Sequence, residues 1–269
     1  MYKFKDFIDI SKINWDYLSL NPNAMHLLEK NPSKIDWDCL SLNPNAIYLL
    51  EKNPTKNNKF YLNKFYLSKN PNAIRFLEQN PTKINWVGLS LNPNAIHLLE
   101  QNPTKIEWSY LSANPNAMHL LERNTDNINW DFLSRNPNAM HLLEQNPDKI
   151  NWEFLSENPS AIHLLERNPT KIFWEGLSEN PNAMHLLEQN PDKIEWTCLS
   201  RNPSAMHLLE QNPDKINWRT LSRNPSIFEI DYAFLKRRID VFREELISRA
   251  MHPSRISRLL ELDVDIEDM

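Results

Sequence analysis

The sequence predicts an all-α fold, an α-solenoid of ten short repeats with a cap at its N-terminal end and another at its C-terminal end. A unit of the form Ile-Asn-Trp-x-x-Leu-Ser-x-Asn-Pro recurs every 22 residues through most of the chain. All nine tryptophans occupy one position of this unit, and Lys64 occupies it in the third copy. The chain has only two glycines, whereas the tight corners of β-helices and propellers require many.

The repeat divides the chain into three parts. Residues 1–11 lack the motif and are expected to form the N-terminal cap. Residues 12–226 hold the ten copies, with five extra residues near 57–61. Residues 227–269 are expected to form a C-terminal helical cap or docking module that ends in an acidic tail. At roughly 8–10 Å per layer of helices, the ten copies predict a curved rod about 80–100 Å long.

Each copy, counted from its Trp, is expected to begin with a helix of about two turns, which can be partly a 3-10 helix. An Asn or Asp directly precedes the Trp position in seven copies and predicts an N-cap, whose side chain accepts from the free N–H groups of the first turn. The Asn-Pro at position +6 ends the helix, because the residue before Pro is driven out of the α region. The seven predicted caps are Asn14, Asp36, Asn63, Asn85, Asn129, Asn151 and Asn217.

A second helix is expected to begin at this Asn-Pro, with Asn21 as its cap and Pro22 in the first helical position in copy one. It would run to the next Asn-Pro, at 31–32, which predicts a β-turn that leads into the following copy. Isolated helices of this length are marginal in water, so the stability of the array must come from stacking of the copies.

The chain after the tenth copy predicts a longer helix. Residues 231–250 form an amphipathic pattern with Leu235, Ile239, Phe242 and Leu246 on one face. A second short helix is expected over 254–262, before the acidic tail. This pattern is consistent with a cap and also with a docking module.

Composition excludes several classes of protein. The net charge of −5 argues against a nucleic-acid partner, and no apolar run approaches the ~20 residues of a membrane span. The N-terminus lacks the apolar region of a secretory signal. Cys39 and Cys198 lie seven copies apart, which predicts two reduced thiols in an intracellular protein that is not secreted.

Seven of the eight histidines share position +11 and form a ladder along the array. The spacing of about 8–10 Å between layers is too long for neighbouring imidazoles to share a metal ion at the ~2.0–2.1 Å of a zinc–nitrogen bond. We therefore expect inter-repeat stacking and hydrogen bonding, and neither a metal nor a cofactor. The ladder consists of His26, His97, His119, His141, His163, His185 and His207.

No motif predicts catalysis. A glutamate stands at position +14 in nine copies, and equivalent copies provide equivalent environments rather than one special pocket. These glutamates therefore predict a repeated ion pair or cap on a solvated edge. The chain lacks a Gly-rich phosphate loop, a Ser-His-Asp arrangement and a pair of cysteines at metal-binding spacing. We expect a protein that is not an enzyme.

Candidate binding residues lie where the copies differ, at positions +1, +2 and +5. Position +5 is apolar in the N-terminal half and charged in the C-terminal half, and an exposed apolar row marks a partner surface. Sequence drift on a solvated face, or leucine packing beneath the cap, would give the same pattern. The candidate protein-binding residues are Leu20, Leu42, Val87 and Leu91.

The unit Ile-Asn-Trp-x-x-Leu-Ser-x-Asn-Pro-Asn-Ala-Ile-His-Leu-Leu-Glu-x-Asn-Pro resembles short repeats in multi-copy protein families of giant DNA viruses of the mimivirus kind. The segments Phe242-Arg243-Glu244-Glu245-Leu246 and His252-Pro253-Ser254-Arg255-Ile256 are similar to the C-terminus of those families. The resemblance implies a viral protein in the virion or in the host cytoplasm, and it implies no specific activity.

Three hypotheses follow for the function. The leading one is a scaffold that binds another protein along the apolar N-terminal half. The second is an adaptor whose C-terminal module docks a host machine such as a ubiquitin ligase, by analogy with other capped repeat proteins. The third, single-stranded RNA binding with one repeat per base, is opposed by the acidic charge. An array with open ends also allows edge-to-edge self-association.

Overall fold

The computed structural model describes residues 2–52, 63–252, 254 and 257. These residues form two units, one over Lys5–Ile227 and the other from residues 2–4 together with the chain from 228 onward. The predicted insertion near 57–61, the acidic tail and nearly all of the predicted helix at 254–262 lie outside the described residues.

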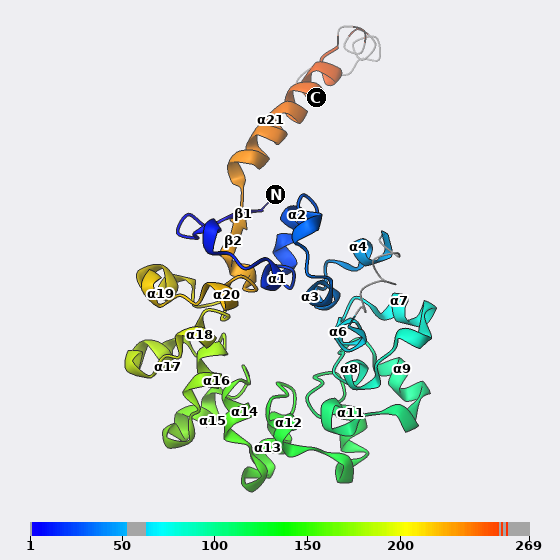
Figure 1. Cartoon of the computed structure of the whole chain (residues 1–269), viewed down its shortest axis with the longest axis vertical. Coiled ribbons are helices and arrows are strands. Elements are labelled where there is room, and N and C mark those ends of the chain that lie inside the picture. Colours follow the sequence, from blue (N-terminus) through cyan, green and yellow to red (C-terminus); the bar gives the residue numbers. More distant parts are fainter. Residues whose placement is uncertain (1, 53–62, 253, 255–256, 258–269) are drawn as a thin grey trace. The chain divides into compact units, whose positions relative to one another are not determined.

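The first unit is an all-α array of short repeats, as predicted, with one helix of each copy toward the centre and the other at the periphery (Figure 1). Each inner helix begins at the Trp position. The inner helices are α1 (Trp15–Leu18), α3 (Trp37–Leu42), α6 (Lys64–Lys69), α8 (Trp86–Ser90), α10 (Trp108–Leu111), α12 (Trp130–Ser134), α14 (Trp152–Ser156), α16 (Trp174–Glu179), α18 (Trp196–Leu199) and α20 (Trp218–Leu221).

The outer helices are just as short. They are α2 (Met25–Leu28), α4 (Ile47–Lys52), α7 (Ile74–Gln79), α9 (Ile96–Gln101), α11 (Met118–Glu122), α13 (Met140–Gln145), α15 (Ile162–Arg167), α17 (Met184–Gln189) and α19 (Met206–Gln211). Each copy contributes one fully buried leucine from its inner helix, and the outer helices of copies one to nine add another, for example Leu133 and Leu143 in copy six. This pattern places the core between the two layers of helices.

The predicted N-caps of the inner helices are confirmed in all seven copies. The side-chain oxygen of each Asn or Asp accepts from the backbone N–H three residues later, as in the bond from the Phe154 amide to Asn151 Oδ1. Glu107, Phe173 and Glu195 occupy the cap position in the remaining copies, and none of them makes this bond. The inner helix also begins at the Trp position in these three copies, so the cap bond accompanies the helix start without being required for it.

The start of the outer helix differs from the prediction. In copy one a single 3-10 turn, η2 (Pro22–Ala24), precedes α2, so the α-helix begins at Met25 rather than at Pro22. Position +6 is an asparagine in every copy, and its side-chain oxygen accepts from the amide two residues later, as Asn21 does from Asn23. The Asn-Pro-x-Ala segment is thus a separate turn, and its asparagine serves the contact between copies.

The segment that leads into the next copy is a 3-10 turn where a β-turn was predicted. These turns are η3 (Pro32–Lys34), η4 (Pro81–Lys83), η5 (Pro103–Lys105), η6 (Thr125–Asn127), η7 (Pro147–Lys149), η8 (Pro169–Lys171), η9 (Pro191–Lys193) and η10 (Pro213–Lys215). Most of them end in a lysine whose ammonium lies over the Trp of its own copy, at 4.4 Å between Lys171 and the centre of the Trp152 ring. In these copies Lys and Trp therefore close the unit through a cation–π contact.

A buried ladder of hydrogen bonds joins neighbouring copies. The Nδ2 of each +6 asparagine donates to two carbonyls of the preceding copy, those of its Ser at +4 and its Asn at +6. Asn136, for example, donates to Ser112 and Asn114 over 3.0 and 2.9 Å. The asparagines and serines of this ladder are almost entirely buried in all ten copies. The invariant polar positions of the repeat are therefore used for packing.

The same ladder connects copy one to copy ten. Asn21 Nδ2 donates to the carbonyls of Ser222 and Asn224 over 3.1 and 2.8 Å, and the Asn14 amide donates to Ser222 Oγ. The ten copies thus close into a ring, and the inner and outer helices follow it around (Figure 1). The predicted rod is wrong, because its two ends bond to each other and cover each other's apolar surface.

The residues before the first copy complete the last one. The 3-10 turn η1 (Ile10–Lys12) ends in a lysine whose ammonium lies 5.2 Å from the centre of the Trp218 ring, the contact that other copies make with their own turn. The tenth copy lacks such a turn of its own, since it ends in η11 (Pro225–Ile227). The boundary predicted at residue 11 therefore falls inside the ring unit, which begins at Lys5.

The second unit contains a two-stranded antiparallel sheet and one long helix. Strand β1 (Tyr2–Phe4) pairs with β2 (Phe228–Ile230), and the rings of Phe4 and Phe228 stack with their centres 4.5 Å apart. Helix α21 (Tyr232–Ala250) follows, with Asp231 as its N-cap, and confirms the long helix predicted from the sequence. Among the described helices, none is both long and apolar enough to cross a membrane.

Candidate functional site on the inner face of the ring

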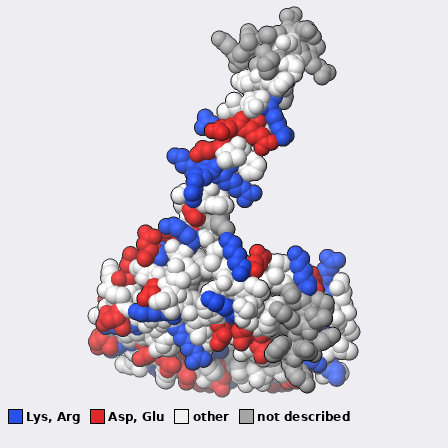
Figure 2. Space-filling model, turned by 45° about the horizontal axis from the view of Figure 1, so that its top comes forward, with Lys and Arg blue, Asp and Glu red and all other residues white. Residues whose placement is uncertain are grey.

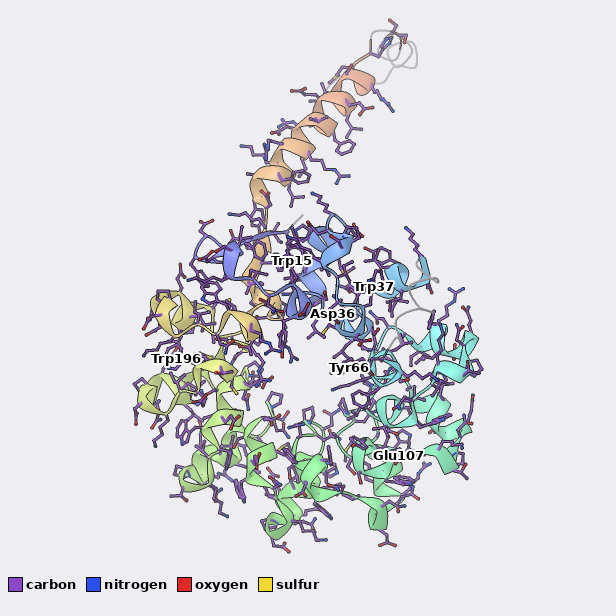
Figure 3. The ribbon with its side chains drawn as sticks, in the orientation of Figure 1. Trp15, Asp36, Trp37, Tyr66, Glu107 and Trp196 are labelled. Carbon is purple, nitrogen blue, oxygen red and sulfur yellow. The ribbon has the colours of Figure 1, made fainter. Side chains whose placement is uncertain are left out.

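The inner helices carry the positions that vary most between copies, +1, +2 and +5. Tyr66, at +2 of copy three, comes from one of the inner helices (Figure 3). Aromatic side chains at +2 contact their neighbours along the ring, with ring centres 5.2 Å apart for Tyr110 and Phe132 and 5.9 Å apart for Phe132 and Phe154. Positions +2 and +5 form one face, because the Arg135 guanidinium at +5 lies 4.6 Å from the centre of the Phe154 ring.

Position +5 carries paired charges in the C-terminal half of the ring. Arg135 donates to Glu157 over 2.7 Å, and Arg201 forms an ion pair with Glu179 at 2.8 Å. Burial acts to lower the pKa of Arg201, but the Glu179 carboxylate and a hydrogen bond to Cys198 outweigh it and raise that pKa. All four charged side chains are thereby fixed in two pairs on the inner face.

A small acidic pocket of about 100 Å³ lies beside the second pair. Copies seven, eight and nine contribute to it, and Arg201 is its one basic group. Its lining residues are Glu153, Glu157, Phe173, Glu175, Gly176, Glu179, Cys198 and Arg201. Within the described parts of the chain, no group of three or more His, Cys, Asp or Glu side chains has the geometry of a metal site.

The candidate partner-binding residues lie on or directly after these inner helices. Leu20, Leu42 and Leu91 occupy position +5 and Val87 occupies +1, and all four are half-buried. They do not form an exposed apolar row. Their side chains share the inner face with the charged residues of the other copies, so the apolar and charged halves seen in the sequence belong to one continuous surface around the ring.

The histidine ladder lies on the outer helices and bonds between copies. The Nε2 atom of each of six histidines lies 2.7–3.1 Å from the Oε1 atom of the +14 glutamate in the preceding copy. Glutamate thus pairs with histidine, while the lysine at +19 lies over tryptophan. The pairs are His97–Glu78, His119–Glu100, His141–Glu122, His163–Glu144, His185–Glu166 and His207–Glu188.

His26, the first histidine of the ladder, has a different environment. Burial lowers its pKa, and a backbone hydrogen bond at Asn23 acts in the opposite direction. The six pairs are about half exposed, and exposed ion pairs contribute at most about 1 kcal/mol each. The ladder is therefore a minor contribution to stability next to the buried asparagines.

Both cysteines are free thiols on the inner helices. Burial, followed by the negative charge of Asp36 and a hydrogen bond to it, raises the pKa of Cys39 to about 12 from 9.0. Burial also raises the pKa of Cys198, against the opposing effect of Arg201. A thiol with such a high pKa is a poor nucleophile, because the thiolate is the reactive form.

Cys39 is therefore expected to react slowly with a disulfide reagent. In a Cys198→Ser variant at pH 8, the folded protein should react at least about 100-fold more slowly than the same protein unfolded in guanidinium. A rate within about tenfold of the unfolded protein would contradict the environment assigned to Cys39.

Because the pKa of Cys39 is raised in the folded protein, this thiol stabilises the fold at neutral pH, and the contribution is lost as pH rises from about 9 toward 12.

Two features of the ring, the contact of Lys12 with Trp218 and the closure itself, could not be recognised from single copies. The cation–π contact of Lys12 with Trp218, like the closure of the ring, joins residues more than 200 positions apart. The segment Lys12-Ile13-Asn14 repeats the Lys-Ile-Asn that precedes later tryptophans, and this was the available signal. Comparisons of the chain with protein-family models, with curated proteins and with solved structures give no match.

Proposed function

We propose that this protein is a non-enzymatic scaffold that binds another protein through helix α21. The supporting observation is the exposure of apolar side chains on this helix, at 73% for Tyr232, 61% for Ile239 and 66% for Leu246. Leu20, Leu42, Val87 and Leu91 are half-buried on the ring, which moves the proposed partner contact to α21. Exposed apolar groups in a row are typical of a protein interface.

The spacing of the apolar residues favours a helical partner. Leu235, Ile239, Phe242 and Leu246 follow one another at intervals of four, three and four residues, the spacing of a coiled-coil seam. A helix that presents this seam is best covered by a second helix with an apolar face of its own. We refer to these four residues as the α21 seam.

The charges beside the α21 seam favour a partner helix with acidic flanks. The flanking positions hold Lys236, Arg238, Arg243 and Glu245, and Glu245 is already paired with Arg249 at 2.5 Å. Figure 2 shows Lys and Arg side chains alternating with acidic and uncharged ones along this helix. The unpaired flanks are thus basic, and acidic residues on the partner would neutralise them.

A second copy of this chain fits the α21 seam less well. A parallel pair would place Arg238 opposite Arg243 of the other copy. An antiparallel pair would place Lys236 opposite Arg243, and it would place Arg238 opposite Glu245, whose carboxylate is already paired with Arg249. Like charges at these positions oppose pairing in both orientations. The occupant we propose is therefore an amphipathic helix of a different protein with Asp or Glu along its flanks.

Two synthetic peptides test this proposal directly. Both carry leucines at seam spacing, and their flanking positions hold glutamate in one peptide and lysine in the other. We expect the full-length protein to bind the glutamate peptide at least about tenfold more tightly. The double variant Ile239→Glu/Leu246→Glu should lose at least about 100-fold in affinity, since each buried apolar side chain contributes about 1.5–3 kcal/mol.

Val241→Glu is the matched control, because Val241 lies on the same helix outside the seam and is 64% exposed. It should bind the glutamate peptide as the unsubstituted protein does. Equal affinity for the two peptides, or no binding of either, would contradict the proposal. A dimer in light scattering that dissociates in the double variant would instead assign the seam to a second copy. Cross-linking of the full-length protein to proteins that it binds in lysate then identifies the natural partner. A ubiquitin ligase among them would support the adaptor hypothesis.

A further inference from the structure

Position +10 of the repeat, where the outer helix begins, holds either methionine or isoleucine. Five copies carry methionine there and four carry isoleucine, and all nine side chains are half-buried. Both residues are apolar and similar in volume, so either of them fills the position. The methionines are Met25, Met118, Met140, Met184 and Met206, and the isoleucines are Ile47, Ile74, Ile96 and Ile162.

The sulfur of the methionine lies against the buried asparagine ladder. Met140 Sδ lies 3.7 Å from Nδ2 of Asn158, the +6 asparagine of the following copy. The thioether sulfur is a weak acceptor, and isoleucine offers no acceptor at all. The same contact, at 3.6–3.7 Å, joins Met25 to Asn43, Met118 to Asn136 and Met184 to Asn202.

The amide group at this contact already uses both of its hydrogens. Asn158 Nδ2 donates to the carbonyls of Ser134 and Asn136, over 3.0 Å in each bond. Asn158 has no exposed surface. A stronger acceptor in place of the sulfur would take a hydrogen that a buried carbonyl now accepts, and a buried carbonyl without a donor destabilises the fold.

We propose that the +10 methionines are sulfoxidation sites through which hydrogen peroxide weakens the contacts between copies of the ring. Peroxide transfers one oxygen atom to the thioether: the O–O bond breaks, an S–O bond forms, the sulfur loses two electrons and water is released. The product is a polar sulfoxide in place of an apolar side chain.

Either orientation of the new oxygen disturbs the contact between copies. A sulfoxide oxygen that turns toward the asparagine displaces one of the two carbonyls from the amide. One that turns away places a polar group among the apolar side chains of the outer helix. Methionine sulfoxide is reduced enzymatically, so the change is reversible.

Exposure distinguishes the +10 side chains from the core beneath them. The leucine three residues later is fully buried, as Leu143 is after Met140, whereas the methionine keeps part of its surface open to a small oxidant. Met251 provides an internal reference, since it is 53% exposed and lies outside the ring unit. It should be oxidised first and without effect on the ring.

Titration with hydrogen peroxide tests the proposal in the full-length protein with Cys39→Ser and Cys198→Ser, so that no thiol is oxidised. Peptide mass spectrometry measures the oxidised fraction of each methionine, and tryptophan fluorescence follows melting, because all nine tryptophans belong to the ring unit. A dose that oxidises only Met251 should leave the melting temperature unchanged. Oxidation of the +10 methionines should lower it by at least about 5 °C.

The matched control replaces all five +10 methionines with the residue that four other copies carry. After the same treatment its melting temperature should stay within about 1 °C of the untreated value. The proposal is overturned if the +10 methionines stay reduced while Met251 is fully oxidised, if their oxidation leaves the melting temperature unchanged, or if the control loses as much. The control is Met25→Ile/Met118→Ile/Met140→Ile/Met184→Ile/Met206→Ile.

Discussion

Replacing Asn21 with alanine is expected to lower the free energy of unfolding by about 2–4 kcal/mol, since it leaves two buried carbonyl groups without donors. These are the carbonyls of Ser222 and Asn224, which accept from Asn21 Nδ2 over 3.1 and 2.8 Å. Asn21 has no exposed surface. Its large effect is specific to a closed ring, because in an open array the first copy would have no preceding neighbour.

Two variants calibrate this measurement. Asn136→Ala removes the same two bonds in the middle of the array and should cost as much as Asn21→Ala. Asn138→Ala removes one exposed bond, from Nδ2 to the Pro115 carbonyl, and should cost less than about 1 kcal/mol. Chemical denaturation followed by tryptophan fluorescence compares the three. If Asn21→Ala behaves like Asn138→Ala, the closing contact does not stabilise the protein in solution.

Gly88→Ala is expected to be about as damaging, at about 2–4 kcal/mol, through a steric clash between copies three and four. An added Cβ at Gly88 would lie 2.4 Å from the backbone oxygen of Phe65, a distance that real Cβ atoms essentially never show. It would also lie 3.2 Å from Ser68 Cβ. Relief requires α6 and α8 to separate, which would disturb the buried bonds from Asn92 to the preceding copy.

Gly176→Ala is the matched control at the same position of copy eight. There an added Cβ would lie 3.0 Å from Glu157 Cγ and 3.2 Å from the backbone oxygen of Glu153, both of them farther than the 2.4 Å at Gly88. The change should stay within about 1 kcal/mol, because the higher helix propensity of alanine offsets the remaining crowding. Thermal unfolding by circular dichroism compares the two. A small effect of Gly88→Ala would show that α6 and α8 separate at little cost.

The sequence predicted the local features that depend on a few neighbouring residues. The seven N-caps, the inner helices at the Trp position and the long helix after Asp231 are confirmed, because capping groups and hydrophobic periodicity act within one or two turns. The start of the outer helix was wrong by about three residues. The +6 asparagine resembles a cap, but its amide group bonds to the neighbouring copy, and a single copy cannot reveal that use.

The closure of the array depends on quantities that no single copy contains. Each copy turns slightly relative to the last, and only the sum over ten copies determines whether the ends meet. The contrast between apolar Leu20 and charged Arg223 at position +5 likewise indicated two halves of a rod. In the ring these positions belong to neighbouring copies of one inner face.

The most direct test of the closed ring is the distance between copies one and ten in solution. Spin labels at Asp16→Cys and Arg219→Cys, with Cys39 and Cys198 replaced by serine, occupy exposed positions on the first and last inner helices. Adjacent copies lie about 8–10 Å apart, so the ring predicts a mean label distance below about 25 Å by electron double resonance. An open array of ten copies would place the labels roughly 70–90 Å apart, and that result would contradict the closed ring.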